Sequence, residues 1–166
     1  MEKINQTIKT NLFSADTKTV IAAINQIKQK GNKLYLPILF DLLNAKPETE
    51  IETEIKSLLE TVKDKAAVSF FMLAFADEKY RPIWKTVLAT CWQNGLDFSD
   101  YSVTFVQLII QEEWEIAFEA FTIIDNFEFL PEQKILTECK NLISNAMENA
   151  DEQKKYFLQE ILTKFN

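Results

Sequence analysis

The residues best suited to do chemistry gather in two short segments of the second half of the chain. The first segment, CWQNGLDFSDY, contains Trp92, Asp97 and Tyr101. An indole, a carboxylate and a phenol in one short segment could frame a recognition groove. The segment also has a purely structural interpretation, because Asp97 is a preferred helix-capping residue and Trp92 can pack against the turn at Gly95.

The second segment is EEWE, from Glu112 to Glu115, and it is followed by Glu119. Glu115 and Glu119 are four residues apart, so they share one face of a helix that also carries Trp114. Paired carboxylates can act as acid and base, or bind a hard cation such as calcium. The alternative is a solvated helix start, where acids in the first turn interact favourably with the helix dipole.

The composition excludes many kinds of catalytic site. The 166 residues include no His, two Cys and two Gly. Without His there is no imidazole base and no Ser-His-Asp triad, and two glycines cannot form a Gly-rich phosphate loop. Cys91 and Cys139 are too few for structural zinc, and each lies on an apolar helix face, where we expect a buried thiol. We therefore predict no catalytic residues, no metal and no cofactor.

Apolar residues recur at helical spacing along the chain, and alternating strand patterns are nearly absent. The pattern predicts an all-α protein with about eight to nine helices, the first of them starting at Asp16. The expected core includes five residues on the apolar stripes: Trp84, Leu88, Phe105, Phe121 and Ile124. No apolar run is long enough to cross a bilayer or to act as a signal peptide, so we expect no membrane span and a cytoplasmic protein.

The predicted helices group in pairs that repeat along the chain. Leu39, Phe71 and Phe105 occupy similar stripe positions and are spaced by 32 and 34 residues. A period of about 30 to 35 residues with two helices per period is typical of an α-solenoid. A tetratricopeptide array, with a period of about 34, and an irregular helical bundle remain as alternatives.

The helical pair KLYLPILFDLLNAKPETEIETEIKSLLETV and the apolar pattern after it resemble HEAT-like repeat proteins of the small, uncharacterised bacterial type. This resemblance implies one domain over residues 1–166, folded as a right-handed α-solenoid of antiparallel helix pairs. Residues 1–30 would form N-terminal capping helices, residues 31–127 the core repeats, and residues 128–166 a C-terminal capping pair.

The charge is distributed unevenly along the chain. Residues 1–46 carry a net charge of +4, residues 47–94 carry −2, and residues 95–166 carry −9. Such asymmetry would steer a basic segment of a partner to the acidic end, although ordinary solvation of outward faces is the simpler explanation. An overall charge of −7 opposes binding to a polyanion, so we expect no nucleic-acid partner.

These observations favour a non-catalytic scaffold that binds a protein partner through the groove lined by the second helix of each pair, as a monomer or a weak dimer. The candidate contact residues are those of the two segments: Trp92, Asp97, Tyr101, Trp114, Glu115 and Glu119. The alternative is an enzyme on a helical scaffold that uses carboxylates, similar to HEAT-like DNA glycosylases. That family uses a basic concave groove with aromatic residues, and this chain offers the aromatic residues without the basic groove.

Overall fold

The computed structural model describes residues 2–31 and 33–166, which form ten α-helices, four short 3-10 helices and no strand. The predicted all-α class is therefore confirmed. The α-helices are α1 (Gln6–Leu12), α2 (Thr17–Lys30), α3 (Leu36–Asn44), α4 (Thr49–Thr61), α5 (Val68–Leu73), α6 (Trp84–Gln93), α7 (Ser102–Gln111), α8 (Trp114–Asp125), α9 (Gln133–Ala146) and α10 (Glu152–Phe165). The 3-10 helices are η1 (Lys33–Tyr35), η2 (Lys65–Ala67), η3 (Glu78–Ile83) and η4 (Ser99–Tyr101).

The helix that the apolar pattern did not predict is α1. Only Ile8 and Leu12 are buried on this short helix, so its apolar stripe covers a single turn. Its start is fixed instead by Asn5, whose side-chain oxygen accepts from the backbone N–H groups of Thr7 and Ile8 at 2.9 and 3.1 Å. This polar cap satisfies two of the donors that every helix start leaves unpaired. The structure has ten α-helices where the sequence predicted about eight to nine, and α1 is the additional helix.

The chain divides into two compact units. Unit 1 comprises Met1–Leu96 and contains α1 to α6, whereas unit 2 comprises Asp97–Asn166 and contains α7 to α10. The single domain over residues 1–166 stays a prediction.

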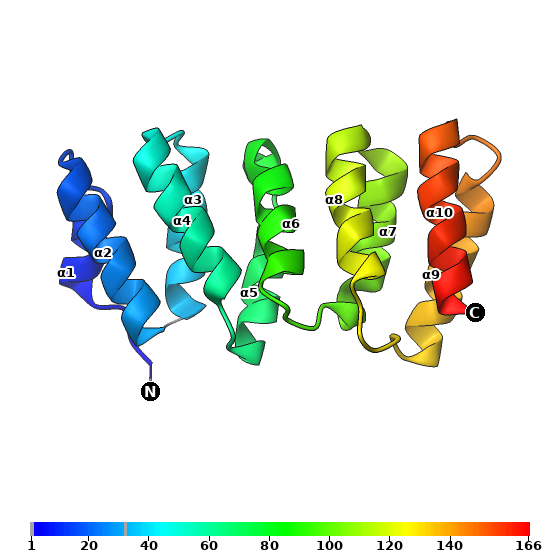
Figure 1. Ribbon diagram of the computed structural model, residues 1–166, viewed down its shortest axis with the longest axis horizontal. Helices are drawn as coiled ribbons and strands as arrows, with labels where there is room; N and C mark the ends of the chain where they lie inside the picture. Colours follow the sequence, from blue (N-terminus) through cyan, green and yellow to red (C-terminus); the bar gives the residue numbers. More distant parts are fainter. Residues whose placement is uncertain (1, 32) are drawn as a thin grey trace. The chain divides into compact units, whose positions relative to one another are not determined.

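In unit 1 the helices follow one another as three pairs, α1 with α2, α3 with α4, and α5 with α6. The second helices lie side by side, α2 against α4 and α4 against α6 (Figure 1). Behind them, α3 packs against α5 and η3. The apolar stripes read from the sequence face inward, and Phe40 lies at the centre, with its ring centroid 6.1 Å from that of Phe71 and 6.2 Å from that of Tyr80.

Polar side chains join the successive pairs of unit 1, and four of these contacts span 31 residues while others span 29 to 39. The Thr17 hydroxyl donates to Glu48 at 2.8 Å, and the Lys33 ammonium contacts both Glu2 and Asp64. Lys63 continues the series by donating to the backbone carbonyl of Asn94. These contacts link each helix pair of unit 1 to the next pair along the chain.

Unit 2 consists of two helix pairs around an aromatic centre. Helix α7 packs against α8 and α9, and α10 packs against α8 and α7. Phe98 and Phe105 lie at the core with their rings edge to face, 6.1 Å apart, and both are almost completely buried. Burial of side chains of this size contributes about 1.5–3 kcal/mol each to folding.

The predicted core is largely confirmed. Trp84, Leu88, Phe105 and Ile124 are buried. Phe121 is of intermediate exposure, so it is less completely buried than the other four. The inward face of α8 is made by residues such as Ala117, Ala120 and Ile124, and Phe121 lies at the edge of that face.

Both cysteines are free and buried, as predicted. Burial raises the pKa of the Cys91 thiol well above its usual value. It also raises the pKa of Cys139 to about 11, with a smaller contribution from the charge of Glu138. Because the thiolate is the nucleophile, both thiols are poor candidates for chemistry in the folded protein.

Candidate functional site

The six candidate contact residues fall in different units. Trp92 belongs to unit 1, where it lies in the last turn of α6 and is about one-third exposed. The other five belong to unit 2. The groove suggested by Trp92, Asp97 and Tyr101 is therefore not formed within either unit.

Asp97 has a local structural role. Its Oδ1 accepts a hydrogen bond from the backbone N–H of Ser99 at 2.9 Å, which closes a turn at the start of η4. The helix α7 begins only at Ser102, without a side-chain cap. Tyr101 precedes that helix and is half-buried. The carboxylate thus holds a 3-10 turn, whereas the sequence predicted that it would cap the long helix.

The EEWE segment is less solvated than the sequence suggested. Glu112 is buried at the end of α7, and only the three residues after it are exposed. Glu115 is exposed in the first turn of α8, and Glu119 is partly exposed one turn later. The carboxylates of Glu115 and Glu119 therefore border the same face of α8 as Trp114.

The most distinctive surface of unit 2 is an aromatic strip formed by Trp114, Phe118 and Phe121 of α8 and Tyr156 and Phe157 of α10. The Trp114 and Phe118 rings are stacked, with centroids 5.2 Å apart and planes 15° apart. Phe121 stacks on Phe157 at 4.8 Å. The centroid of the Phe118 ring lies 6.2 Å from that of Phe157. The centroid of the Tyr156 ring lies 6.4 Å from that of Phe121.

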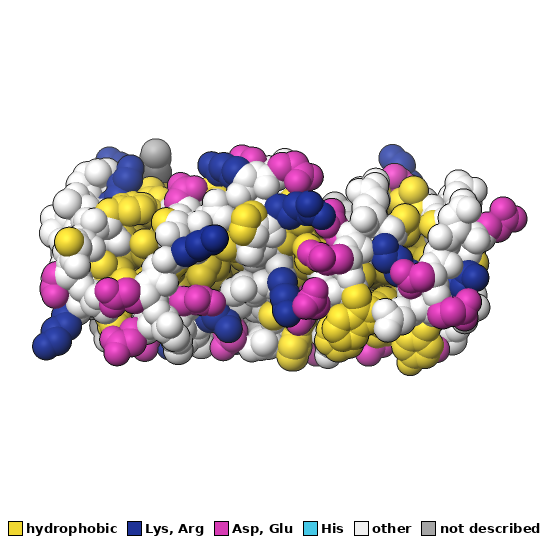
Figure 2. Space-filling view, turned by 90° about the horizontal axis from the view of Figure 1, so that it is seen from above, with side chains coloured by type: hydrophobic (Ala, Val, Ile, Leu, Met, Phe, Trp, Pro, Cys, Tyr) yellow, Lys and Arg dark blue, Asp and Glu magenta, His cyan; other side chains and the backbone are white. Residues whose placement is uncertain are grey.

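Much of this strip faces solvent. Trp114 is 47% exposed, Phe118 40% and Tyr156 57%, while Phe157 lies buried beneath them. Figure 2 shows hydrophobic side chains gathered at the surface over α8 and α10. Large stacked rings left open to water are unusual for a surface without a partner, because single apolar residues are common there but contiguous ones are not.

Carboxylates flank the strip on α10. Glu152, Tyr156 and Glu160 are four residues apart, so they share one exposed face of the helix. The Glu152 side chain is 94% exposed and lies 3.5 Å from the Lys155 ammonium. On α8, Asp125 ends the same face as Trp114 and Phe118 and is exposed.

Sequence reasoning identified Trp114 but missed the other rings of the strip. Phe121 was assigned to the core, and Phe118, Tyr156 and Phe157 were not considered as a site. The available signal was the four-residue spacing of Trp114 and Phe118, which places two rings together on one face of a helix. The contribution of α10 depends on how α8 and α10 pack, which the sequence does not state.

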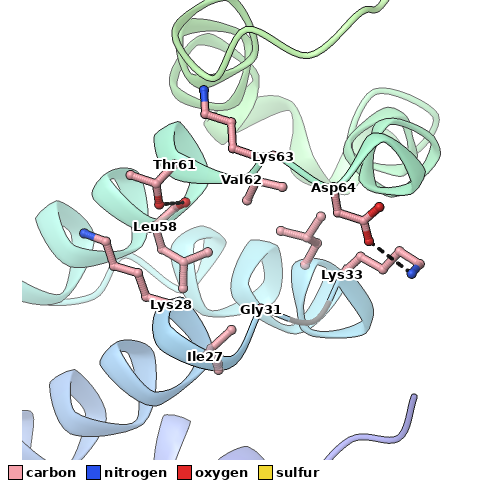
Figure 3. Close-up of a pocket in the computed structure, with 10 residues that line it drawn as sticks. Ile27, Lys28, Gly31, Lys33, Leu58, Thr61, Val62, Lys63 and Asp64 are labelled. Carbon is pink, nitrogen blue, oxygen red and sulfur yellow. Dashed lines mark hydrogen bonds and ion pairs between the residues drawn. The ribbon is translucent and has the colours of Figure 1, made fainter. Parts of the chain in front are cut away.

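A pocket of about 150 Å³ lies in unit 1 where α2 and α4 end (Figure 3). Its lining includes three lysines, Lys28, Lys33 and Lys63. Figure 3 shows that these three side chains point in different directions. The Lys28 ammonium donates to Ser57 at 2.7 Å, and that of Lys63 donates to the Asn94 carbonyl.

Lys33 is held between two carboxylates beside this pocket. Its ammonium lies 2.8 Å from Glu2 and 3.2 Å from Asp64, and these hydrogen bonds raise the pKa of Lys33, with the larger effect from Glu2. The pKa of Asp64 is lowered, first by the backbone N–H of Ala66 and then by Lys33. The lysines of the pocket therefore bind neighbouring helix pairs to one another instead of converging on a ligand.

Comparison of the chain with known protein families, with curated proteins and with solved structures finds no match. Among residues 2–31 and 33–166, no three acidic or sulfur-bearing side chains are grouped as a metal site requires. No helix in this described part of the chain is both long and apolar enough to cross a bilayer.

Proposed function

We propose that this chain is a non-catalytic protein-interaction module of the HEAT-like type, which binds a protein partner through the second helices of its pairs. The observation that carries this proposal is the exposed aromatic strip on α8 and α10. Both helices are the second members of their pairs, which is where the sequence placed the binding groove. A cytoplasmic location and a monomeric or weakly dimeric state remain part of the proposal.

The strip has the composition of an interaction hot spot. Trp and Tyr dominate binding energies at protein interfaces, because a large rigid ring buries much area at a small entropic cost. Trp114 and Tyr156 are about half exposed in the chain alone, so a partner would remove a considerable apolar area from water. The buried Phe157 ring contacts Phe118 and Tyr156, with centroids 6.2 and 6.1 Å away.

The regular spacing of unit 1 supports the repeat type. Contacts at 31 residues join Thr17 to Glu48, Lys33 to Asp64, and Lys63 to Asn94. In a solenoid each repeat contacts its neighbours alone, so contacts between repeats span about one repeat length. The packing of α2 on α4 and of α4 on α6 fits that description and favours stacked pairs over an irregular bundle.

The test is affinity capture with the full chain from a lysate of the native organism, followed by binding of each captured protein in purified form. Trp114→Ala and Tyr156→Ala should each weaken that purified interaction about tenfold, as expected for hot-spot residues. The matched control is Phe129→Ala, since Phe129 is an exposed ring of unit 2 outside the strip. A purified partner that binds wild type and both strip variants equally would contradict the proposed surface.

A further inference from the structure

We infer that the aromatic strip binds arginine side chains of a basic peptide segment. This inference rests on the proposed protein-binding function and names the chemistry of the partner. It follows from the shape of the rings, from the carboxylates beside them, and from the charge of unit 2.

The rings provide a flat surface of the right kind for a guanidinium. Trp114 and Phe118 are nearly parallel, and their faces lie on a partly exposed side of α8. A guanidinium is planar and weakly hydrated, so it stacks on an aromatic face and gains a cation–π attraction, which is strongest with Trp. Tyr156 adds a third exposed ring, whose centroid lies 6.4 Å from that of Phe121.

Carboxylates flank Tyr156 on α10 and can accept hydrogen bonds from the edge of a guanidinium stacked on its ring. Glu152 and Glu160 stand one turn before and one turn after Tyr156 on the exposed face of α10. The Glu152 carboxylate lies 3.5 Å from the Lys155 ammonium, and the Glu152 side chain is 94% exposed. Such a pair is weak, and an incoming arginine can replace it with a shorter, two-pronged contact.

The net negative charge of unit 2 favours a positively charged partner. Unit 2 contains five lysines and fourteen acids, a net charge of −9. Two of these lysines, Lys154 and Lys164, donate to the backbone carbonyls of Ile110 and Asp125, so their hydrogen bonds are made to main chain and not to carboxylates. The field around the strip therefore attracts basic segments.

The same charge argues against the other ligand that stacks on aromatic rings. Nucleic-acid bases bind such platforms when a positive groove follows the phosphate backbone. Here the phosphates would meet a net charge of −9. An arginine-bearing peptide satisfies the rings and the carboxylates together, whereas a nucleotide satisfies the rings alone.

The experiment measures binding of three labelled decapeptides to the full chain by fluorescence anisotropy. The peptides alternate Gly with Arg, with Lys, or with citrulline, which keeps the planar shape of Arg without its charge. We expect the Arg peptide to bind tightest, the Lys peptide about threefold more weakly, and the citrulline peptide more weakly still. A tenfold rise in salt should weaken the Arg peptide strongly.

Variants of the full chain then assign the binding to the strip. Trp114→Ala should weaken the Arg peptide about 3- to 30-fold, and Trp114→Phe should weaken it less because a ring remains. Glu160→Gln should also weaken it, and Phe129→Ala should leave it unchanged. Thermal melts of each variant confirm that the exposed substitutions leave the fold intact.

Two outcomes would overturn the inference. If Arg and Lys peptides bind equally and Trp114→Ala has no effect, the attraction is general electrostatics and no arginine site exists. If no peptide binds while a purified protein partner is lost on Trp114→Ala, the proposed function stands and the arginine chemistry is wrong. Failure of both the peptides and the partner experiment would contradict both proposals.

Discussion

The two units bury aromatic rings and use charged side chains in opposite ways. Unit 1 places Phe40, Phe71 and Tyr80 together inside its core and joins its helix pairs with polar contacts at the surface. Unit 2 also buries aromatic rings, among them Phe98 and Phe105, but it leaves Trp114, Phe118 and Tyr156 at the surface. The polar side chains at the surface of unit 1 bind its helix pairs to one another, whereas the aromatic rings at the surface of unit 2 are accessible to a partner.

The charge balance shows the same contrast. Unit 1 carries thirteen basic and eleven acidic residues, a net charge of +2, against −9 for unit 2. In unit 1, Lys33 and Lys79 contact carboxylates, whereas Lys28 and Lys63 donate to the Ser57 hydroxyl and the Asn94 carbonyl. In unit 2, Lys154 and Lys164 bond to carbonyls at or near the C-terminal ends of α7 and α8, where a cation also interacts favourably with the helix dipole. The acids of unit 2 are thus in excess, and the excess lies in the unit that has exposed rings.

The largest expected effect tests whether each unit has a core of its own. Phe40→Ala in unit 1 and Phe105→Ala in unit 2 should each cost about 3–5 kcal/mol, because both side chains are completely buried. Urea unfolding followed by far-UV circular dichroism measures the total loss. Trp114 is the only Trp of unit 2, so in a Trp114→Phe background Trp fluorescence follows unit 1 alone.

In that background, Phe40→Ala should shift the fluorescence transition more than Phe105→Ala does. Equal shifts would show that the two units unfold together in one cooperative transition, so that the units would not have separate cores. Phe121→Ala provides a matched control within unit 2, since this ring is half-buried and its loss should cost clearly less than that of Phe105.

The helices could be predicted from the sequence because each long helix buries one apolar stripe and ends at a recognisable residue. Gly31 shows this, since it follows α2 with a φ of 59° and donates to the Ile27 carbonyl at 2.8 Å. In that left-handed region a side chain would be strained, so glycine at this position marks a helix end. Helix α1 was not predicted because its two buried residues are too few to form a recognisable apolar pattern. The sequence feature that marks its start is the capping residue Asn5.

The candidate site could be predicted only in part. Trp114, Glu115 and Glu119 follow from spacing along one helix, which local sequence determines. Tyr156 and Phe157 join them through the packing of α10 on α8, a contact between residues about forty apart that no local pattern encodes. Trp92 and Asp97 were grouped because they are close in sequence, although they lie in different units.

A smaller effect sharpens the contrast between an inner and an outer tyrosine. The Tyr80 hydroxyl donates to Asp41 at 2.5 Å, and Lys79 lies over its ring at 4.6 Å from the centroid. Burial, followed by the bond to Asp41, raises the pKa of Tyr80. Tyr80→Phe should therefore cost about 1–2 kcal/mol, because a hydrogen bond to a charged group is lost.

The matched control is Tyr156→Phe in unit 2, where the ring is 57% exposed. Its hydroxyl is at the surface, so the free energy of unfolding should stay within about 0.5 kcal/mol of wild type. Chemical denaturation of both variants provides the comparison. A larger loss for Tyr156→Phe than for Tyr80→Phe would reverse the assignment of inner and outer rings.

The cap at the start of α10, the helix that carries Tyr156 and Phe157, can be tested by its effect on stability. Asp151 Oδ1 accepts from the backbone N–H of Lys154 at 2.8 Å. Asp151→Ala removes this cap and should cost about 1 kcal/mol, whereas Asp151→Ser keeps an acceptor and should cost less. Thermal unfolding monitored by circular dichroism distinguishes the two. If Asp151→Ala melts like wild type, packing on α8 alone fixes the start of α10.

The smallest expected effect is a pH dependence at the matching cap of unit 1. Asp16 Oδ2 accepts from the Thr19 hydroxyl at 2.6 Å and from its backbone N–H at 3.0 Å, and these bonds lower the pKa of Asp16 below its ordinary value of 3.8. A carboxyl whose pKa is lower in the folded state stabilises the fold above its unfolded pKa. That contribution is lost as the pH falls through the folded pKa.

Asp16→Asn keeps a side-chain acceptor for the cap but removes the ionisation. Wild type should therefore be more stable than this variant at pH 5, and the difference should shrink steadily as the pH falls below 3.8. Urea midpoints measured in the Trp114→Phe background from pH 5 to about pH 2.5 follow unit 1 directly. A difference that stays constant over this range would mean that the charge of Asp16 contributes nothing and that the cap acts through its hydrogen bonds alone. In that case the charge of Asp16 would not stabilise unit 1. The difference between the two units would then lie in where their aromatic rings are placed, buried in unit 1 and partly exposed in unit 2.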